Sequence, residues 1–388
     1  MIKKFFLLKN FQKKFSRSTD KKKISKILKE VLNENSQTIK SLSKNYLNSY
    51  KKKQFSRYKK FSNYRLIGMG GSTLGTQTIY DFLKDKIKKN FIFINNLQNR
   101  QKKEKKKDFI NLIVSKSGNT IETITNTNIL IKKTDENIFI TENKRSYLHT
   151  LAEKLKAEIV HHNNFIGGRY SVLSEVGMLP AELMGLNTGS FKQLNSLIKN
   201  KKFFDSLVKN VSSTFFLIKK KRFNSIIINY DEKSESLFSW YQQLIAESLG
   251  KKKKGLLPII SRMPKDNHSV MQFYLDGPQN NFFTFFYVHD DKVEKIKNNT
   301  ILSSHKFLKN KKISNIIYAQ KKATENIFYK KKIPFRSFEI VRRDEKALGE
   351  LFCFFILETI LLGKLLGVNP FDQPAVELIK KETKKILI

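Results

Sequence analysis

Short apolar runs alternate with amphipathic stretches along most of this chain, and this alternation limits the fold more than any other feature. Between residues 64 and 160, apolar runs such as 64–67 and 109–114 are followed by stretches with helical spacing. The same order returns between about residues 225 and 288. Strands that alternate with helices predict a mostly parallel sheet covered by helices on both faces. Two such units predict an α/β fold of two similar domains with a cleft between them.

The length supports this division, because 388 residues exceed the roughly 250–300 that one hydrophobic core usually serves. Residues 1–60 carry 19 Lys or Arg against 3 Asp or Glu, with apolar residues at helical spacing, which predicts amphipathic helices there. We expect a helical segment over residues 1–45, a first α/β domain over 46–190, and a second over 191–388 that ends in C-terminal helices.

The net charge of +41 raises the question of a nucleic-acid partner. Only 11 of the 75 basic residues are arginine, the residue that bidentate phosphate and base contacts favour. The lysine runs are scattered between the predicted elements rather than forming a continuous stripe. We therefore expect these runs to lie in solvent and no nucleic acid to bind. The runs are residues 51–53, 105–107, 219–221, 251–254 and 330–332.

The apolar segments do not predict a membrane protein. The run at residues 5–8 is shorter than the roughly 7–15 residues that a signal sequence needs. The run at 351–366 is interrupted by Glu358 and Lys364 and is too short to span a bilayer, so it predicts a buried helix. The single cysteine, Cys353, lies inside that run, excludes an internal disulfide, and is expected to be a buried small hydrophobic residue. We expect a cytoplasmic protein with no membrane partner.

Two turns that follow predicted strands have the composition of an anion site. The first is GMGGSTLG, residues 68–75, where glycines end a strand and a helix begins. Glycines let a backbone approach an anion closely, and a helix N-terminus offers free N–H groups. The second is SKSGNT, residues 115–120, with three hydroxyls and a lysine. A tight connection would explain the first turn and helix capping the second. Two such strand ends in one sheet nevertheless predict a phosphate site.

Four further residues are candidates for the chemistry. Arg169 follows a glycine pair in a chain that otherwise prefers lysine, which indicates a need for a planar, permanently charged group. Glu247 lies near the end of a predicted helix, where a carboxylate can serve as a base. His268 begins a predicted helix and suits proton transfer, while Lys380 follows a proline-bounded helix start. Each also has an ordinary interpretation, as a surface arginine, a solvated glutamate, a capping histidine or a surface lysine.

Taken in order, these segments resemble the glucose-6-phosphate isomerase (phosphoglucose isomerase) family over roughly residues 64–381. The matching motifs are GMGGSTLG, VSKSGNTIET, GGRYSVLSEVGMLP, QQLIAESLGK, NHS and NPFDQPAVELIKK. The resemblance implies two sugar-isomerase domains, each a mostly parallel sheet flanked by helices. It also implies reversible isomerisation of glucose 6-phosphate and fructose 6-phosphate through a cis-enediol intermediate, with no metal and no organic cofactor.

The resemblance also implies roles for individual residues. Glu247 would move the proton between C2 and C1, and Arg169 would stabilise the charge on the intermediate. His268 and Lys380 would assist opening of the sugar ring. In this family the histidine reaches the neighbouring subunit's site, so a homodimer with His268 contributed across the interface is expected. The implied substrate-binding residues are Gly71 and Ser72 at the sugar, Ser115, Lys116, Ser117 and Thr120 at the phosphate, and Gln373, which helps to position the substrate.

The sequence departs from the family pattern at Thr73, Asn119 and Ile379, none of which is a proposed catalytic group. Three alternatives remain open at this point. They are an isomerase that also accepts mannose 6-phosphate, a sugar-phosphate-binding regulator without turnover, and a basic nucleic-acid-binding protein whose affinity falls steeply with salt.

Overall fold

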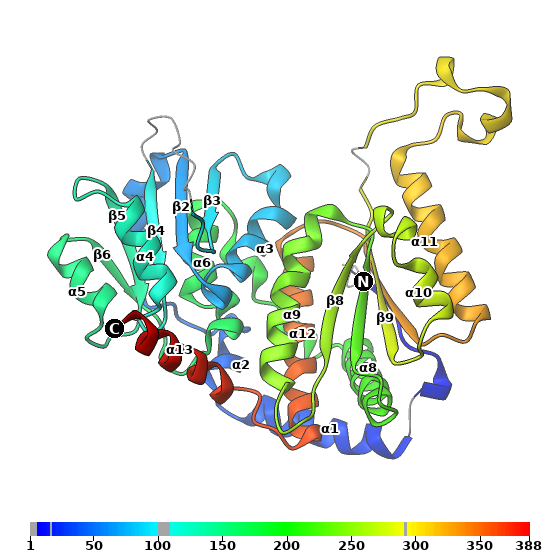
Figure 1. Ribbon diagram of the computed structural model, residues 1–388, viewed down its shortest axis with the longest axis horizontal. Helices are drawn as coiled ribbons and strands as arrows, with labels where there is room; N and C mark the ends of the chain where they lie inside the picture. Colours follow the sequence, from blue (N-terminus) through cyan, green and yellow to red (C-terminus); the bar gives the residue numbers. More distant parts are fainter. Residues whose placement is uncertain (1–5, 16–17, 100–108, 291–292) are drawn as a thin grey trace.

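Two five-stranded sheets lie side by side in the computed structural model, with helices on their faces and between them (Figure 1). The structure describes residues 6–15, 18–99, 109–290 and 293–388. Phe5 of the N-terminal apolar run and the lysine run at 105–107 therefore lie outside the described residues. The predicted α/β class, with two parallel-rich sheets flanked by helices, is confirmed.

The first sheet is fully parallel, with the strand order β3-β2-β4-β5-β6. Every residue of β4 is buried, as expected for a central strand covered on both faces. The strands are β2 (Asn63–Gly68), β3 (Asn90–Ile94), β4 (Ile110–Val114), β5 (Glu136–Thr141) and β6 (Glu158–His161). The helices of this half are α3 (Leu74–Phe82), α4 (Ile121–Leu130), α5 (Tyr147–Lys154) and α6 (Glu175–Leu183).

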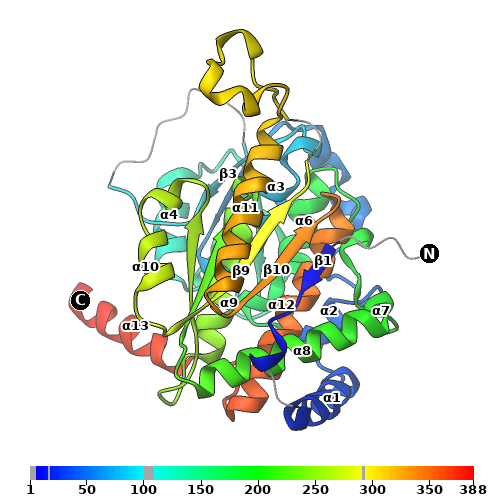
Figure 2. The ribbon, with the colours of Figure 1, turned by 90° about the vertical axis from the view of Figure 1, so that its right-hand side faces the viewer.

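The second sheet has the order β1-β10-β9-β7-β8 and is parallel except for β1, which runs antiparallel to β10. Figure 2 shows α11 lying across this sheet and β1 at its edge. The strands are β1 (Phe6–Lys9), β7 (Asn224–Asn229), β8 (Leu257–Arg262), β9 (Asn281–Val288) and β10 (Phe335–Ile340). The helices are α7 (Leu194–Leu197), α8 (Lys201–Lys219), α9 (Glu235–Leu249), α10 (Met271–Asp276), α11 (Ile313–Lys330), α12 (Glu345–Leu366) and α13 (Pro374–Leu387).

The N-terminal segment is only partly helical. The predicted helices are present as α1 (Ser18–Asn33) and α2 (Gln37–Ser41), but residues 6–9 form β1 instead of a helix. This short run pairs with β10 and adds an edge strand to the second sheet, so tertiary pairing outweighs the helical pattern around it. The division of the chain at residues 45 and 190 stays a prediction.

One continuous hydrophobic core joins the two halves. Helix α3 of the first half packs against α9 of the second, and α9 in turn packs against α12. The predicted buried helix is confirmed as part of α12, and Cys353 is fully buried within it. Glu358, also on α12, is buried against the guanidinium of Arg336 on β10, which explains the charge inside the apolar run. Among the described helices, none is long and apolar enough to cross a membrane.

Three of the lysine runs are exposed as predicted, namely residues 51–53, 219–221 and 330–332. The run at 251–254 corrects that expectation at one position. Only 12% of the Lys251 side chain is exposed, because its ammonium group pairs with the carboxylate of Asp372. Lys254 in the same run, although an exposed residue, donates to the carbonyl oxygen of Leu366 at 2.8 Å. This run therefore contacts the C-terminal part of the chain rather than solvent alone.

Candidate active site

A cavity of about 1100 Å³ lies where the first half meets α9 and α13. Its walls come from the turn after β2, the start of α4, one face of α9 with the residues that follow it, and the segment that leads into α13. Four of the residues predicted from sequence line it, namely Thr120, Glu247, Gln373 and Lys380.

The topology of the first sheet explains this position. Strand β2 pairs with β3 on one side and β4 on the other, so the strand order reverses between β2 and β4. The crevice beyond the carboxyl ends of strands at such a point is the usual ligand site of an open parallel sheet. The turn after β2 begins with Met69 and Gly70, and both line the cavity. Gly70 has φ +52°, a conformation that side-chain-bearing residues rarely adopt.

Gly71 brings a second turn against the first. A Cβ atom at Gly71 would lie 2.2 Å from the carbonyl carbon of Gly168 and 2.4 Å from the backbone nitrogen of Arg169. Only glycine permits this approach, and it places the 3₁₀ helix Gly168–Leu173 directly beside the turn after β2. Gly71 is buried and Ser72 half-buried, and neither lines the cavity, whereas Met69 and Gly70 of the same turn do. The role of Gly71 and Ser72 at the sugar stays a prediction.

Arg169 makes more hydrogen bonds to other predicted site residues than any of them, and it is only 2% exposed. Its Nη1 donates to Glu247 Oε1 at 2.9 Å and to Gln373 Oε1 at 2.9 Å. Its Nε donates to Ser248 Oγ at 2.7 Å, and its Nη2 donates to the carbonyl oxygen of Pro370 at 2.7 Å. The alternative of a surface arginine is therefore wrong. A planar guanidinium with five donors makes these contacts at once, which the single ammonium of a lysine cannot.

Glu247 lies in the last turn of α9, as predicted, and both of its oxygens are held. Arg169 binds Oε1, and Gln243 Nε2 donates to Oε2 at 2.9 Å. Its side chain is 22% exposed and lines the cavity, so the carboxylate is oriented and still accessible to a ligand. The alternative of a fully solvated glutamate is wrong.

Gln243 is a site residue that sequence reasoning missed. Its Oε1 is buried and has no hydrogen-bond partner among the described residues, although its Nε2 is occupied by Glu247. The signal was present, because Gln243 lies four residues before Glu247 on a predicted helix and so shares its face. Because this oxygen is shielded from solvent, Gln243 contributes to the site through its bond to Glu247.

The hydroxyl-rich turn after β4 is partly directed at the cavity. Thr120 lines it, and its hydroxyl is 3.0 Å from that of Ser115, which is buried behind it. Ser117 is exposed, and its oxygen accepts from the backbone N–H of Asn119 at 3.3 Å. Lys116 donates to the carbonyl oxygen of Asn164 at 2.8 Å, beside the loop that leads to Arg169. These residues form one turn, as predicted.

The remaining predicted residues differ in position. Gln373 precedes α13 and accepts from Arg169. Lys380 lies on the exposed α13, where its ammonium is 2.7 Å from Glu377, and it still borders the cavity. His268 is exposed in the 3₁₀ helix Lys265–His268 and does not line this cavity. Its role in the site of a neighbouring subunit stays a prediction.

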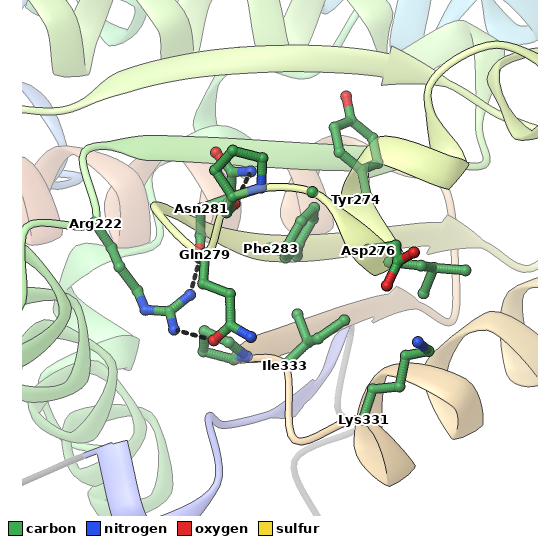
Figure 3. Close-up of a pocket in the computed structure, with 12 residues that line it drawn as sticks. Arg222, Tyr274, Asp276, Gln279, Asn281, Phe283, Lys331 and Ile333 are labelled. Atoms are coloured by element: carbon green, nitrogen blue, oxygen red, sulfur yellow. Dashed lines mark hydrogen bonds between the residues drawn. The ribbon is translucent and has the colours of Figure 1, made fainter.

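A second, smaller cavity of about 190 Å³ lies at the amino ends of β9 and β10 (Figure 3). Arg222 is at its edge and donates to the carbonyl oxygen of Asn281 at 2.7 Å and to Gln279 Oε1 at 3.3 Å. None of the residues predicted for the site lines this cavity. In the part of the chain that the structure describes, no cluster of three His, Cys, Asp or Glu side chains could hold a metal ion.

Comparisons with known proteins agree with the motifs. The family model described as phosphoglucose isomerase matches residues 16–260. A glucose-6-phosphate isomerase of Methanocaldococcus jannaschii is 32% identical over 354 residues, which cover 84% of this chain and 85% of that protein. A glucose-6-phosphate isomerase of Mycoplasmopsis pulmonis is 34% identical over 353 residues, which cover 83% of this chain and 82% of that protein.

Solved structures support the same fold. A hypothetical protein from Thermus thermophilus matches with a TM-score of 0.84 at 22% identity, covering 98% of this chain and 99% of that one. A glucose-6-phosphate isomerase from Chlamydia trachomatis matches with a TM-score of 0.66 at 18% identity, covering 95% of this chain and 74% of that one. At these identities the likeness shows the fold alone, and its coverage extends to the part of the chain beyond residue 260.

Proposed function

Since the chain belongs to the phosphoglucose isomerase family, we propose that it is a glucose-6-phosphate isomerase with its active site in the cavity around Arg169 and Glu247. It interconverts glucose 6-phosphate and fructose 6-phosphate, a step of glycolysis and gluconeogenesis, and we place it in the cytoplasm. The observation that carries the assignment of the site is the contact of Arg169 with both Glu247 and Gln373 at 2.9 Å.

Glu247 is the base of this proposal. Interconversion of an aldose and a ketose requires a proton to leave one of two adjacent carbons and return to the other, and one carboxylate can do both. Arg169 and Gln243 each bind one oxygen of Glu247, so the carboxylate meets the substrate in a fixed orientation. A fixed orientation lowers the entropic cost of reaching the transition state.

Arg169 is the electrostatic partner. Removal of the proton leaves negative charge on the enediol oxygens, and a permanently charged guanidinium beside the base stabilises that charge. Because Arg169 is held by Ser248 Oγ and by backbone carbonyls, it does not have to reorganise as the charge develops. The same buried charge also keeps Glu247 and Gln373 at one place in the cavity.

The substrate lies between the two turns of the first sheet and α13. Its phosphate binds the turn with Ser115, Lys116, Ser117 and Thr120, whose hydroxyls and N–H groups suit a monoester. Lys380 and a His268 from the partner subunit of a homodimer assist ring opening, and Gly71, Ser72 and Gln373 fix the sugar.

The test compares the turnover of fructose 6-phosphate by the wild type and by Glu247→Gln in a coupled assay. The wild type converts it to glucose 6-phosphate, and Glu247→Gln loses roughly 10²–10⁴-fold in kcat because general base catalysis is worth about that factor. Glu235→Gln is the matched control, since Glu235 begins the same helix, pairs with Arg262 and does not line the cavity.

Two results would contradict the proposal. Wild-type turnover in Glu247→Gln removes Glu247 as the base, and an inactive wild type that still binds the sugar phosphate indicates a regulator. The same assay with mannose 6-phosphate decides substrate breadth.

A further inference from the structure

The segment between α12 and α13 determines where α13 lies. Helix α12 ends at Leu366, and the left-handed φ of +67° at the following Gly367 turns the chain toward residues 368 and 369, which line the cavity. Helix α13 itself has no buried residue and lies on the outside of the molecule (Figure 1). Because packing does not fix α13, its placement depends on residues 369–373, which carry Gln373 to Arg169.

Two cations from different elements hold this segment. Arg169 donates from Nη2 to the carbonyl oxygens of Pro370 at 2.7 Å and Asp372 at 3.1 Å. Lys251 approaches from the other side, 2.7 Å from Asp372 Oδ1, and also donates to the carbonyl oxygen of Asn369. The hydrogen bond from Lys251 is the main cause that lowers the pKa of the Asp372 carboxyl.

The ion pair of Lys251 with Asp372 matters for the site because Lys251 is close to Glu247 in the sequence. It follows directly after α9 and Gly250, four residues beyond Glu247. Helix α9 carries the proposed base, and Lys251 just after it binds residues 369–372. These residues lead to Gln373 and to α13 with Lys380. An ion pair whose carboxylate is about half exposed contributes little to global stability, so its effect is on position.

We infer that Lys251 is a positioning residue of the active site, which acts through Asp372 to set α13 against Glu247. This inference rests on the proposed function for its kinetic consequences. The alternative is that Lys251, which lines the cavity, binds the anionic substrate directly. The two mechanisms differ, because Asp372 is needed only if Lys251 acts through it.

The kinetic test is a double-mutant cycle with Lys251→Met, Asp372→Asn and the double variant, using fructose 6-phosphate. We expect each single variant to lose about tenfold in kcat with little change in KM, since small displacements of catalytic groups have effects of this size or larger. The double variant should lose no more than the worse single variant, because both break the same contact. Lys253→Met is the control, since Lys253 is exposed in the same run and does not line the cavity.

Other kinetic results would overturn the inference. A raised KM in Lys251→Met with a wild-type-like Asp372→Asn means direct binding of substrate. A double variant whose loss equals the product of the two single losses means that the residues act independently. Wild-type kcat in Lys251→Met removes the role altogether.

A second measurement does not depend on activity. Trypsin cleaves after the lysines of α13, including Lys380 and Lys381, and mass spectrometry follows the release of the C-terminal peptides. Release should be several-fold faster in Lys251→Met and Asp372→Asn than in Lys253→Met, because a helix that is not anchored opens more readily. Equal rates of peptide release in the three variants would contradict the inference that Lys251 and Asp372 anchor α13. Faster release in a protein whose wild type is inactive would keep the anchor and reject the proposed function.

Discussion

His162 shows how burial alone changes the behaviour of one residue near the site. It follows β6 in the loop that leads to Arg169, and it is 2% exposed. Its Nδ1 is 3.0 Å from the carbonyl oxygen of Asn163, so this nitrogen carries the proton and donates. Burial lowers the pKa of His162 to about 4, although the carboxylate of Glu175 lies 3.8 Å away. The histidine is therefore neutral in the folded protein at physiological pH.

This shift predicts a loss of stability in mild acid. Above pH 6.5 the histidine is neutral in both states, whereas between pH 6.5 and 4 only the unfolded chain takes up the proton. Proton uptake by the unfolded chain therefore lowers the free energy of unfolding at pH 5 by about 2 kcal/mol relative to its value at pH 7. Denaturant unfolding at pH 7 and pH 5 should show a smaller loss of stability in His162→Gln than in the wild type. An equal loss in both proteins would contradict the assigned titration.

Sequence reasoning reached the site residues whose chemistry is unusual for their surroundings. An arginine in a lysine-rich chain and hydroxyls after an apolar strand are informative signals, since Arg169 binds the cavity residue Glu247 and Thr120 lines the cavity. Gln243 and Lys251 were missed because they are ordinary types for a helix face and a lysine run. Their importance comes from the partners Glu247 and Asp372, and a partner distant in sequence is set by the fold.

At the scale of elements, the site depends on the contact between the turn after β2 and the 3₁₀ helix that carries Arg169. Gly71 permits this contact because a Cβ there would lie 2.2 Å from the backbone of Gly168. Neither neighbour is a flexible side chain that could move aside. The backbones of the two elements would have to separate, which would move Arg169 away from Glu247.

We therefore predict that Gly71→Ala loses about 1–3 kcal/mol of stability and most of its turnover. Gly167→Ala is the matched control. A Cβ there meets nothing nearer than 3.6 Å, and Gly167 has φ −66°, which alanine adopts freely. Thermal unfolding and the isomerase assay on both variants check this. Similar effects in the two variants would show that the close approach at Gly71 is not needed.

Helices and strands were predictable from sequence where the spacing of apolar residues within the segment itself indicates the element. The strands and helices expected at residues 64–160 and 225–288 follow from apolar spacing and are present within a few residues of these positions, whereas α6, α7 and α8 between them were not predicted. Strand β1 was not predictable, because its four residues carry no strand pattern of their own and gain hydrogen bonds only by pairing with β10, more than 300 residues away. The position of Glu358 inside an apolar helix likewise depends on a distant partner, because Glu358 forms a buried ion pair with Arg336.

For the whole molecule, the open question is whether one chain contains a complete site. Within the described residues the proposed base and Lys380 line the cavity and Arg169 binds the base, whereas His268 is exposed and lies outside the lining. An exposed residue that does not line the cavity of its own chain can reach the cavity of a second copy. In a twofold dimer, that relation is reciprocal, so each site would combine Glu247 of one chain with the partner's histidine.

Mixing two inactive proteins tests this arrangement. His268→Ala and Glu247→Gln are each expected to be nearly inactive alone. In a hybrid dimer, the chain with an intact Glu247 receives an intact histidine from the other chain, so one of the two sites works. Random reassembly of equal amounts should restore about a quarter of wild-type activity, because half of the twofold dimers are hybrids.

The control is the same reassembly carried out with each variant alone. If His268 served the site of its own chain, every site in a hybrid would still lack one group, and mixing would restore nothing. A measured recovery therefore requires both a dimer and exchange of the histidine across its interface. Absence of recovery, with hybrids shown to form by native mass spectrometry, would place the histidine's role within one chain or remove it.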